Sequence, residues 1–187
     1  MLQVLKSKSQ ATDQYAEAGW LERLPREAAL LVCVGLTLFL LAALISYHAD
    51  DAGWSSSGTG EPARNLIGGV GAWIADVLLS LVGYVAFFLP WAVFVLGIRI
   101  YRGETDAPAM PWPVRAFAWL ALLPSFAAIC SMHIGVFGSF PPQGAGGIVG
   151  HALSGWLVGL LNTVGASLLL LTATLATLPL ALMFSWV

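Results

Sequence analysis

Four long apolar runs dominate this chain and limit what it can fold into. The first extends from Ala28 to Tyr47, twenty residues without a charged side chain. Twenty helical residues rise about 30 Å at about 1.5 Å each, which matches the hydrocarbon thickness of a bilayer. Three further runs of this kind follow. The pattern predicts a protein that spans a membrane.

Composition supports the same class of protein. Hydrophobic residues make up 58% of the 187 residues and charged residues only 10%, too little polar surface to cover a soluble globule. The net charge is -2 and the 8 basic residues are dispersed, whereas a DNA-binding surface requires clustered lysine and arginine. We therefore expect no direct contact between this segment and nucleic acid.

The boundaries of the runs predict an all-α, polytopic membrane protein with four transmembrane helices. Backbone groups in lipid must be hydrogen-bonded within the chain, and the sequence lacks the alternating pattern of an outer-membrane barrel. The second run extends from Leu66 to Ile98, the third starts after Arg115 and the fourth reaches Val187. We place the membrane domain at residues 28–187, with spans at about 28–47, 74–98, 116–137 and 160–182.

The basic residues predict which side of the membrane each loop faces. Seven of the eight lysines and arginines lie before the first run or between the second and third runs, and only Arg64 lies elsewhere. Loops rich in lysine and arginine stay in the cytoplasm, so we expect both termini and residues 99–115 there. The loops 48–73 and 138–159 are then expected to be periplasmic.

Residues 1–27 are expected to form a cytoplasmic N-terminal tail. A secretory signal peptide is the competing interpretation, but four acidic residues lie in this segment and no small-x-small cleavage site follows Tyr47. Trp20 and Leu21, which lie beside arginines, favour a short interfacial helix that stops at Pro25. A disordered tail is the alternative.

The second run carries one charged residue, Asp76, and is longer than a span requires. Counting about twenty residues back from Arg99 puts the outer end of the span near Leu79 and Asp76 at the outer interface. We expect an acid that reaches water there, with a partner or inter-subunit contact and a proton relay as alternatives. The fourth run has a similar excess, so both helices are expected to be long and to extend into the periplasm.

Small residues predict where helices pack closely. Gly155, Gly159 and Thr163 recur every four residues, and such stripes let helix backbones approach each other in lipid. We expect the stripe to pack on the second run, with another subunit as the alternative. Both long runs also open with glycine-rich segments and continue to a later glycine, a faint repeat whose spacing differs by three residues. The further packing candidates are Gly68, Gly71, Gly83 and Gly165.

Residues that could perform chemistry are scarce. His48, Asp50 and Asp51 form a cluster of potential ligands, but without a fourth partner a helix cap or a turn from Asp51 to Gly53 is the better interpretation. Both lysines lie near the amino terminus, so no phosphate-binding loop of the form G-x-x-x-x-G-K-[ST] is present. We expect no catalytic activity, cofactor or metal in this segment. Both cysteines lie inside apolar runs, where we expect them to pack as small hydrophobes.

Three motifs follow one another around the apolar runs. Ser46-Tyr47 leads to Asp50-Asp51-Ala52-Gly53-Trp54-Ser55, then comes Asn65-x-x-Gly68-x-x-Gly71-Ala72-Trp73-x-x-Asp76, and glycines from Gly144 to Gly150 precede the fourth run. In order, topology and spacing, residues 27–187 resemble the N-terminal four-helix membrane domain of the FtsK family of bacterial DNA translocases. The periplasmic motif candidates are Asp50, Asp51, Trp54, Asn65, Trp73 and Asp76.

The resemblance implies a function for the segment. Members of this family are division proteins of the bacterial inner membrane that act at the septum, and a linker and a hexameric, ATP-driven DNA motor follow their membrane domain. By this resemblance the chain anchors a translocase that couples chromosome segregation to septation, forms a homo-oligomer, as a hexamer, and recruits other division proteins. The chain has no linker or motor, so we expect a portion of a longer protein. The alternative is a small self-standing membrane transporter or channel subunit, because the two long helices could line a cavity.

Overall fold

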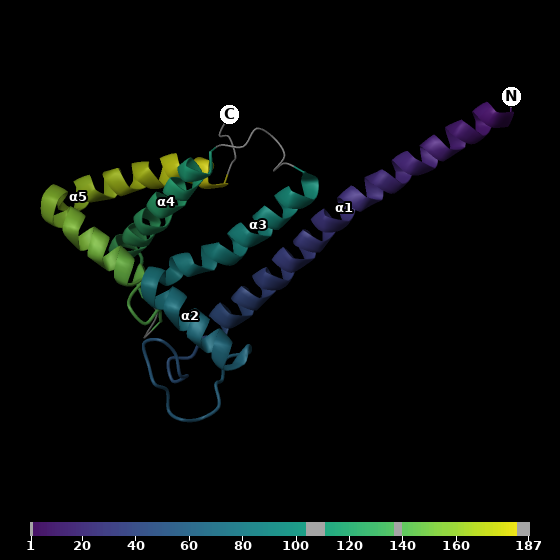
Figure 1. Ribbon diagram of the computed structural model, residues 1–187. Helices are drawn as coiled ribbons and strands as arrows, with labels where there is room; N and C mark the ends of the chain where they lie inside the picture. Colours follow the sequence, from purple (N-terminus) through teal and green to yellow (C-terminus); the bar gives the residue numbers. More distant parts are fainter. Residues whose placement is uncertain (1, 104–110, 137–139, 183–187) are drawn as a thin grey trace.

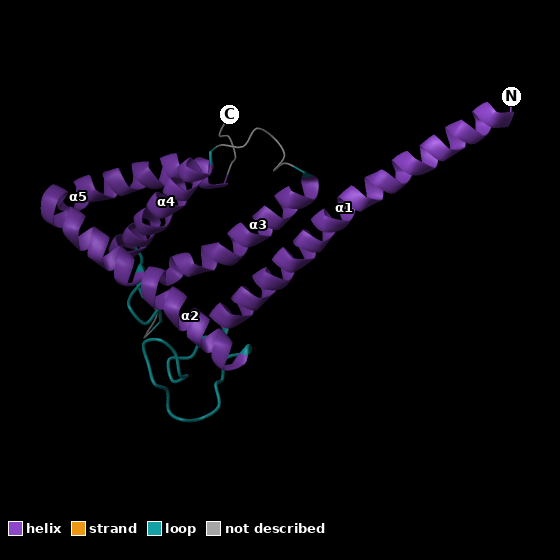
Figure 2. Cartoon of the chain, in the orientation of Figure 1, coloured by secondary structure: helices purple, strands orange, loops and turns teal. Residues whose placement is uncertain are grey.

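The computed structural model describes residues 2–103, 111–136 and 140–182, which form helices joined by loops (Figure 2). In chain order the elements are α1 (Leu2–Ile45), α2 (Gly68–Val82), the 3-10 helix η1 (Gly83–Phe87), α3 (Phe88–Arg102), α4 (Trp112–His133) and α5 (Gly147–Leu182). No strand occurs among these residues, so the predicted all-α fold class is confirmed.

Among the described residues, four segments are long and apolar enough to cross a membrane, as predicted. They are Leu24–Ile45, Gly68–Arg102, Pro113–His133 and Gly147–Leu182, with lengths of 22, 35, 21 and 36 residues. The second and fourth segments are the long ones, in agreement with the sequence. The predicted end of the third span at residue 137 lies outside the described residues.

The helices form two pairs that meet at one end of the molecule (Figure 1). Helix α1 lies along α3 and α4 lies along α5, while α2 and η1 contact both pairs. The loop between α1 and α2 and the loop before α5 gather at the end where the pairs meet. The amino terminus lies at the opposite end.

Helix α1 continues through Pro25, and the expectation of a short helix that stops there is wrong. It is helical from Leu2 to Ile45, with Pro25 inside it. A proline removes one backbone hydrogen bond from a helix, and the segment before it is rich in alanine, leucine, glutamate, glutamine and lysine, which favour helix. The alternative of a disordered tail is wrong for the same residues.

Both long segments bend, and they bend at matching positions. Gly68 and Gly83 have positive φ values of 71° and 61°, and Gly147 and Asn162 have values of 60° and 56°. Fifteen residues separate the members of each pair. The faint repeat therefore has a regular spacing when Gly83 corresponds to Asn162 rather than to Gly165. Because each segment changes direction, its full length does not run along one axis (Figure 1).

Small residues fill the core. Alanine accounts for ten of the eighteen buried hydrophobic residues in the described chain, and small side chains let helix backbones lie close together in lipid. One cluster contains Ala43, Ala75 and Leu79, where the end of α1 meets α2. Cys130 belongs to another, which agrees with its expected role as a small hydrophobe, and both cysteines are free thiols.

Candidate functional site

The loop between α1 and α2 encloses a group of buried polar side chains. Residues 46–67 fold back over the ends of both helices (Figure 2). Three of the motif residues, Asp51, Asn65 and Asp76, are buried within or beneath this loop. Buried polar groups must be hydrogen-bonded to be tolerated, so their partners define the structure of the loop.

Asp51 ties the end of the loop to its beginning. Its Oδ1 accepts the backbone N–H of Arg64 at 2.8 Å and its Oδ2 accepts the backbone N–H of Asn65 at 2.9 Å. The side chain is 8% exposed, so these bonds are shielded from water. Hydrogen bonds to a charged acceptor are about twice as strong as neutral ones, which suits a residue that closes a loop.

A hydrogen-bonded turn lies at residues 48–51, earlier than the expected turn from Asp51 to Gly53, and the expected helix cap is absent. The backbone N–H of Asp51 donates to the carbonyl of His48 at 3.2 Å, and that of Gly53 donates to the carbonyl of Ser56 at 2.8 Å. The residue before α2 is Ile67, whose side chain does not cap the helix. The Asp51 carboxylate instead binds the backbone N–H groups of Arg64 and Asn65, which lie three and two residues before Ile67.

Asn65 joins the end of α1 to the start of α2. Its Nδ2 donates to the carbonyls of Ala43 at 2.7 Å and Ser46 at 3.2 Å, and its Oδ1 accepts the backbone N–H of Ile67 at 3.0 Å. The last carbonyls of a helix have no partner within the helix, so the amide satisfies groups that burial would otherwise leave unpaired. One side chain therefore fixes how the chain leaves α1 and enters α2.

Asp76 is buried, and the expectation that it reaches water is wrong. Its side chain is 3% exposed. Its Oδ1 accepts hydrogen bonds from the hydroxyls of Tyr47 at 3.2 Å and Ser55 at 2.8 Å, and its Oδ2 accepts the backbone N–H of Ser55 at 2.5 Å. Counting residues along the second run placed Asp76 near the outer end of a span, where water was expected to reach it. In the structure the loop folds over Asp76 and supplies these donors.

Gly53 allows the loop to approach Asp76 this closely. A Cβ atom at position 53 would lie 2.6 Å from Oδ2 of Asp76. Real Cβ atoms essentially never approach that closely, so any side chain here would push the loop away from α2.

The carboxylates also perturb Tyr47. Its partial burial, together with the charge and hydrogen bond of Asp76 and the charge of Asp51, raises the pKa of Tyr47 from 10.0 to about 12. Each of these effects disfavours the phenolate. Tyr47 therefore stays a hydrogen-bond donor throughout the physiological range.

Tyr47 also connects the two loops at this end of the molecule. Its ring lies 6.0 Å from that of Phe140, which is 5.7 Å from Tyr84 and 6.4 Å from Phe87. The hydroxyl of Tyr84 donates to the carbonyl of Phe140 at 3.2 Å. The segment before α5 is thus held against the first helix pair by aromatic contacts.

The remaining motif residues lie on the surface. Trp54 is 52% exposed and Trp73 is 51% exposed, and Asp50 is exposed as well. The buried network therefore brings three predicted residues together and leaves three outside. Tyr47 and Ser55 were not among the site candidates, although both belong to the motifs, and their hydroxyl groups are the signal that could have identified them.

The sequence matches a known family over most of its length. Residues 22–187 match the family described as the 4TM region of DNA translocase FtsK/SpoIIIE. The chain belongs to this family.

Curated relatives carry the same family name. The chain is 32% identical over 148 residues to DNA translocase FtsK of Shewanella oneidensis, which covers 78% of this chain and 16% of the relative. It is 31% identical over 186 residues to DNA translocase FtsK 2 of Ralstonia nicotianae, a match that covers 94% of this chain and 23% of the relative. The chain thus spans about a quarter or less of the length of these relatives. No solved structure matches it.

The glycine candidates of this FtsK/SpoIIIE 4TM region fall into two groups. A Cβ atom at Gly71 would overlap Oδ1 of Asn65, and one at Gly83 would overlap the carbonyl of Ala145. A Cβ atom at Gly155 or Gly159 would meet nothing within 4 Å. The expected packing of that stripe on the second run of the same chain is therefore wrong, because α5 turns this face outward.

Three other candidates complete this comparison. Gly68 supplies the positive φ at the start of α2, with open space around it. A Cβ atom at Gly165 would approach only Leu161 of the same helix, at 3.1 Å, and Thr163 is exposed. Their role in helix packing or an interface stays a prediction.

The polar network of the 4TM region holds a loop in place. All four carboxylate oxygens of Asp51 and Asp76 accept hydrogen bonds from N–H or O–H groups of this chain. Within the described residues, no group of three His, Cys, Asp or Glu side chains is placed to hold a metal ion. The arrangement is suited to fixing a surface that carries exposed tryptophans.

Proposed function

We propose that this chain is the membrane anchor of a DNA translocase that couples chromosome segregation to septation, and that its outer loop recruits division partners. Family membership and four membrane-spanning segments support the anchor. The fixed loop between α1 and α2 is the observation that carries the recruitment role. The DNA-pumping motor belongs to the part of the protein beyond this segment.

The distribution of charge supports a bacterial inner membrane with both termini in the cytoplasm. Arg99, Arg102 and Arg115 lie near the end of α3 and the start of α4, while the α1–α2 loop carries only Arg64 among basic residues. Such an imbalance orients membrane proteins with the basic side inward. In this orientation the Asp51 and Asp76 network faces the periplasm.

A fixed loop favours binding because little conformational entropy is lost on association. The hydrogen bonds of Asp51, Asn65 and Asp76 hold the loop before a partner arrives, which lowers the cost of ordering it. Exposed tryptophans such as Trp54 and Trp73 are typical centres of binding energy in protein interfaces. We propose that these two side chains contact a periplasmic partner.

The outward stripe on α5 supports a homo-oligomer, a hexamer by family resemblance. Gly155, Gly159 and Thr163 are exposed in the single chain, and small residues at this spacing allow a neighbouring helix to approach closely. A shared membrane anchor raises the effective concentration of motor subunits, so weak contacts between anchors assist assembly.

Septal enrichment in the bacterium that encodes the chain tests the recruitment role. A fluorescent fusion of the native protein is compared with a variant that combines Trp54→Ala and Trp73→Ala. We expect the native fusion at the septum and the variant spread through the membrane. Trp91→Ala is the matched control, because Trp91 is 48% exposed on α3.

Two outcomes would contradict the proposal. An even distribution of the native fusion over the membrane would show that the protein is not recruited to the septum. Undiminished septal enrichment in the double variant, with membrane fractionation unchanged, would show that these tryptophans do not contact the partner.

A further inference from the structure

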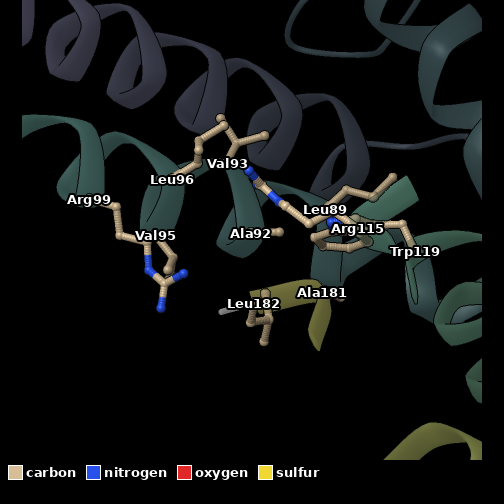
Figure 3. A pocket seen from close by; sticks show the side chains of 10 residues that line it. All are labelled: Leu89, Ala92, Val93, Val95, Leu96, Arg99, Arg115, Trp119, Ala181 and Leu182. Atoms are coloured by element: carbon tan, nitrogen blue, oxygen red, sulfur yellow. The ribbon is translucent and has the colours of Figure 1, made fainter. Parts of the chain in front are cut away.

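A cavity of about 330 Å³ lies between α3, α4 and the end of α5, and its lining runs along α3 from Leu89 to Arg99 (Figure 3). This volume falls within the range of about 300–1,000 Å³ that is typical of small-ligand sites. Most of its lining is aliphatic or aromatic, with Leu89, Val93, Leu96 and Trp119 among the residues that form it.

Two arginines complete the lining. Arg99 comes from α3 and Arg115 from α4 (Figure 3). Each lies within one helical turn of a helix end, because α3 ends at Arg102 and α4 begins at Trp112. Helices that span a membrane leave the hydrocarbon at their ends, so these two residues are at the depth of lipid head groups.

More positive charge lies at the same end. A Cβ atom at Gly103, directly after α3, would lie 2.6 Å from Nη1 of Arg26, so α1 brings a third guanidinium close to this end of α3. The cavity thus combines apolar walls with a positively charged boundary. An anionic phospholipid has the complementary form, an apolar chain joined to a phosphate.

We propose that this cavity binds one anionic phospholipid, with the phosphate beside Arg99 and Arg115 and an acyl chain against Leu89, Val93 and Leu96. Guanidinium groups form paired hydrogen bonds with phosphate oxygens, which a zwitterionic head group weakens through its own ammonium. Basic pockets between membrane helices are known to select anionic head groups. The bound lipid would hold α3, α4 and the end of α5 together where their side chains leave a gap.

Native mass spectrometry of the full chain in detergent tests the site. The probes are phosphatidylglycerol and phosphatidylcholine in equal amounts, and we expect phosphatidylglycerol to bind preferentially. A basic residue contributes about 1 kcal/mol near an anionic head group, so Arg99→Gln or Arg115→Gln should weaken phosphatidylglycerol binding about fivefold. Ala92→Trp, which fills the cavity and keeps both arginines, should reduce the binding of both lipids.

Two comparisons separate a defined site from general attraction. Arg102→Gln removes a charge from the same end of α3 but not from the cavity lining, so it should change binding less than Arg99→Gln. Thermal unfolding is then followed with either sodium phosphate or phosphatidylglycerol added, and only the lipid should raise the melting temperature. Equal effects of Arg102→Gln and Arg99→Gln, equal stabilisation by phosphate alone, or unchanged lipid binding in Ala92→Trp would each overturn the proposal.

Discussion

The hydroxyl of Tyr47 donates a 3.2 Å hydrogen bond to the buried carboxylate of Asp76, although 29 positions separate them in the chain. The ring of the same tyrosine contacts Phe140 in the second loop. Tyr47 therefore links the end of α1, the middle of α2 and the segment before α5. Removing any part of this arrangement should loosen the end that carries the two loops before it affects the membrane spans.

Asp76→Asn should destabilise the loop. The amide has one acceptor oxygen in place of two, so a donor from Ser55 or Tyr47 loses its partner, and an unsatisfied buried group costs about 1–3 kcal/mol. We expect faster proteolysis of residues 48–67 and a lower melting temperature in detergent. Asp50→Asn is the matched control, since Asp50 is exposed, and equal effects of the two variants would contradict the role of Asp76.

Tyr47 should make stability depend on pH in the alkaline range. Its pKa is about 12 in the folded chain against 10.0 for the unperturbed group. The unfolded chain then loses this proton first, so the contribution is fully present below pH 10 and declines as pH rises toward 12. The difference in phenolate absorbance between the native protein and Tyr47→Phe measures this titration. A difference titration centred near pH 10 would contradict the contact with Asp76.

Two glycines on α2 should respond in opposite directions to alanine. At Gly71 the new Cβ would overlap Asn65 and Ile67, and overpacking of this kind costs about 1–3 kcal/mol. At Gly69 the Cβ would meet no atom within 4 Å, and alanine favours helix by about 0.5–1 kcal/mol relative to glycine. Thermal unfolding should therefore show Gly71→Ala below the native protein and Gly69→Ala at or above it. The reverse order would show that Asn65 does not pack against α2.

Asn162→Gly should stabilise α5. Asn162 has φ 56° and ψ 173°, a region populated almost entirely by glycine, and such residues store about 1–3 kcal/mol of strain. Glycine adopts this conformation freely, so the melting temperature should rise. Thr163→Gly is the control at the next position, where glycine in an ordinary helix should cost about 0.5–1 kcal/mol. A fall in melting temperature for Asn162→Gly would contradict the bend.

Gly155→Leu combined with Gly159→Leu should weaken self-association and leave the fold of the single chain intact. A Cβ atom at either position meets no atom of the same chain within 4 Å, whereas leucine side chains there would separate a helix packed on this face. Crosslinking in membranes and light scattering in detergent measure the change in oligomer mass. Gly35→Leu is the control, because Gly35 on α1 is also without neighbours within 4 Å. An unchanged oligomer mass in the double variant would show that the stripe is not an interface between subunits.

The number of spans and the class of fold could be predicted from the amino-acid sequence alone. Length and hydrophobicity of an apolar run are local properties, and the bilayer requires them wherever the helix lies in the fold, so the four segments could be identified without tertiary information. The motifs around Asp51 and Asn65 were also visible, because each is short and continuous.

The roles of those residues depend on contacts between distant parts of the chain and could not be predicted. The donors to Asp76 come from positions 21 and 29 residues earlier in the chain, so its burial depends on how the loop folds back. Gly155 and Gly159 face outward because the part of α5 before Asn162 buries another face, which includes Ser154 and Leu157. Lipid and protein interior are equally apolar, so hydrophobicity cannot distinguish a packed helix face from one that faces outward.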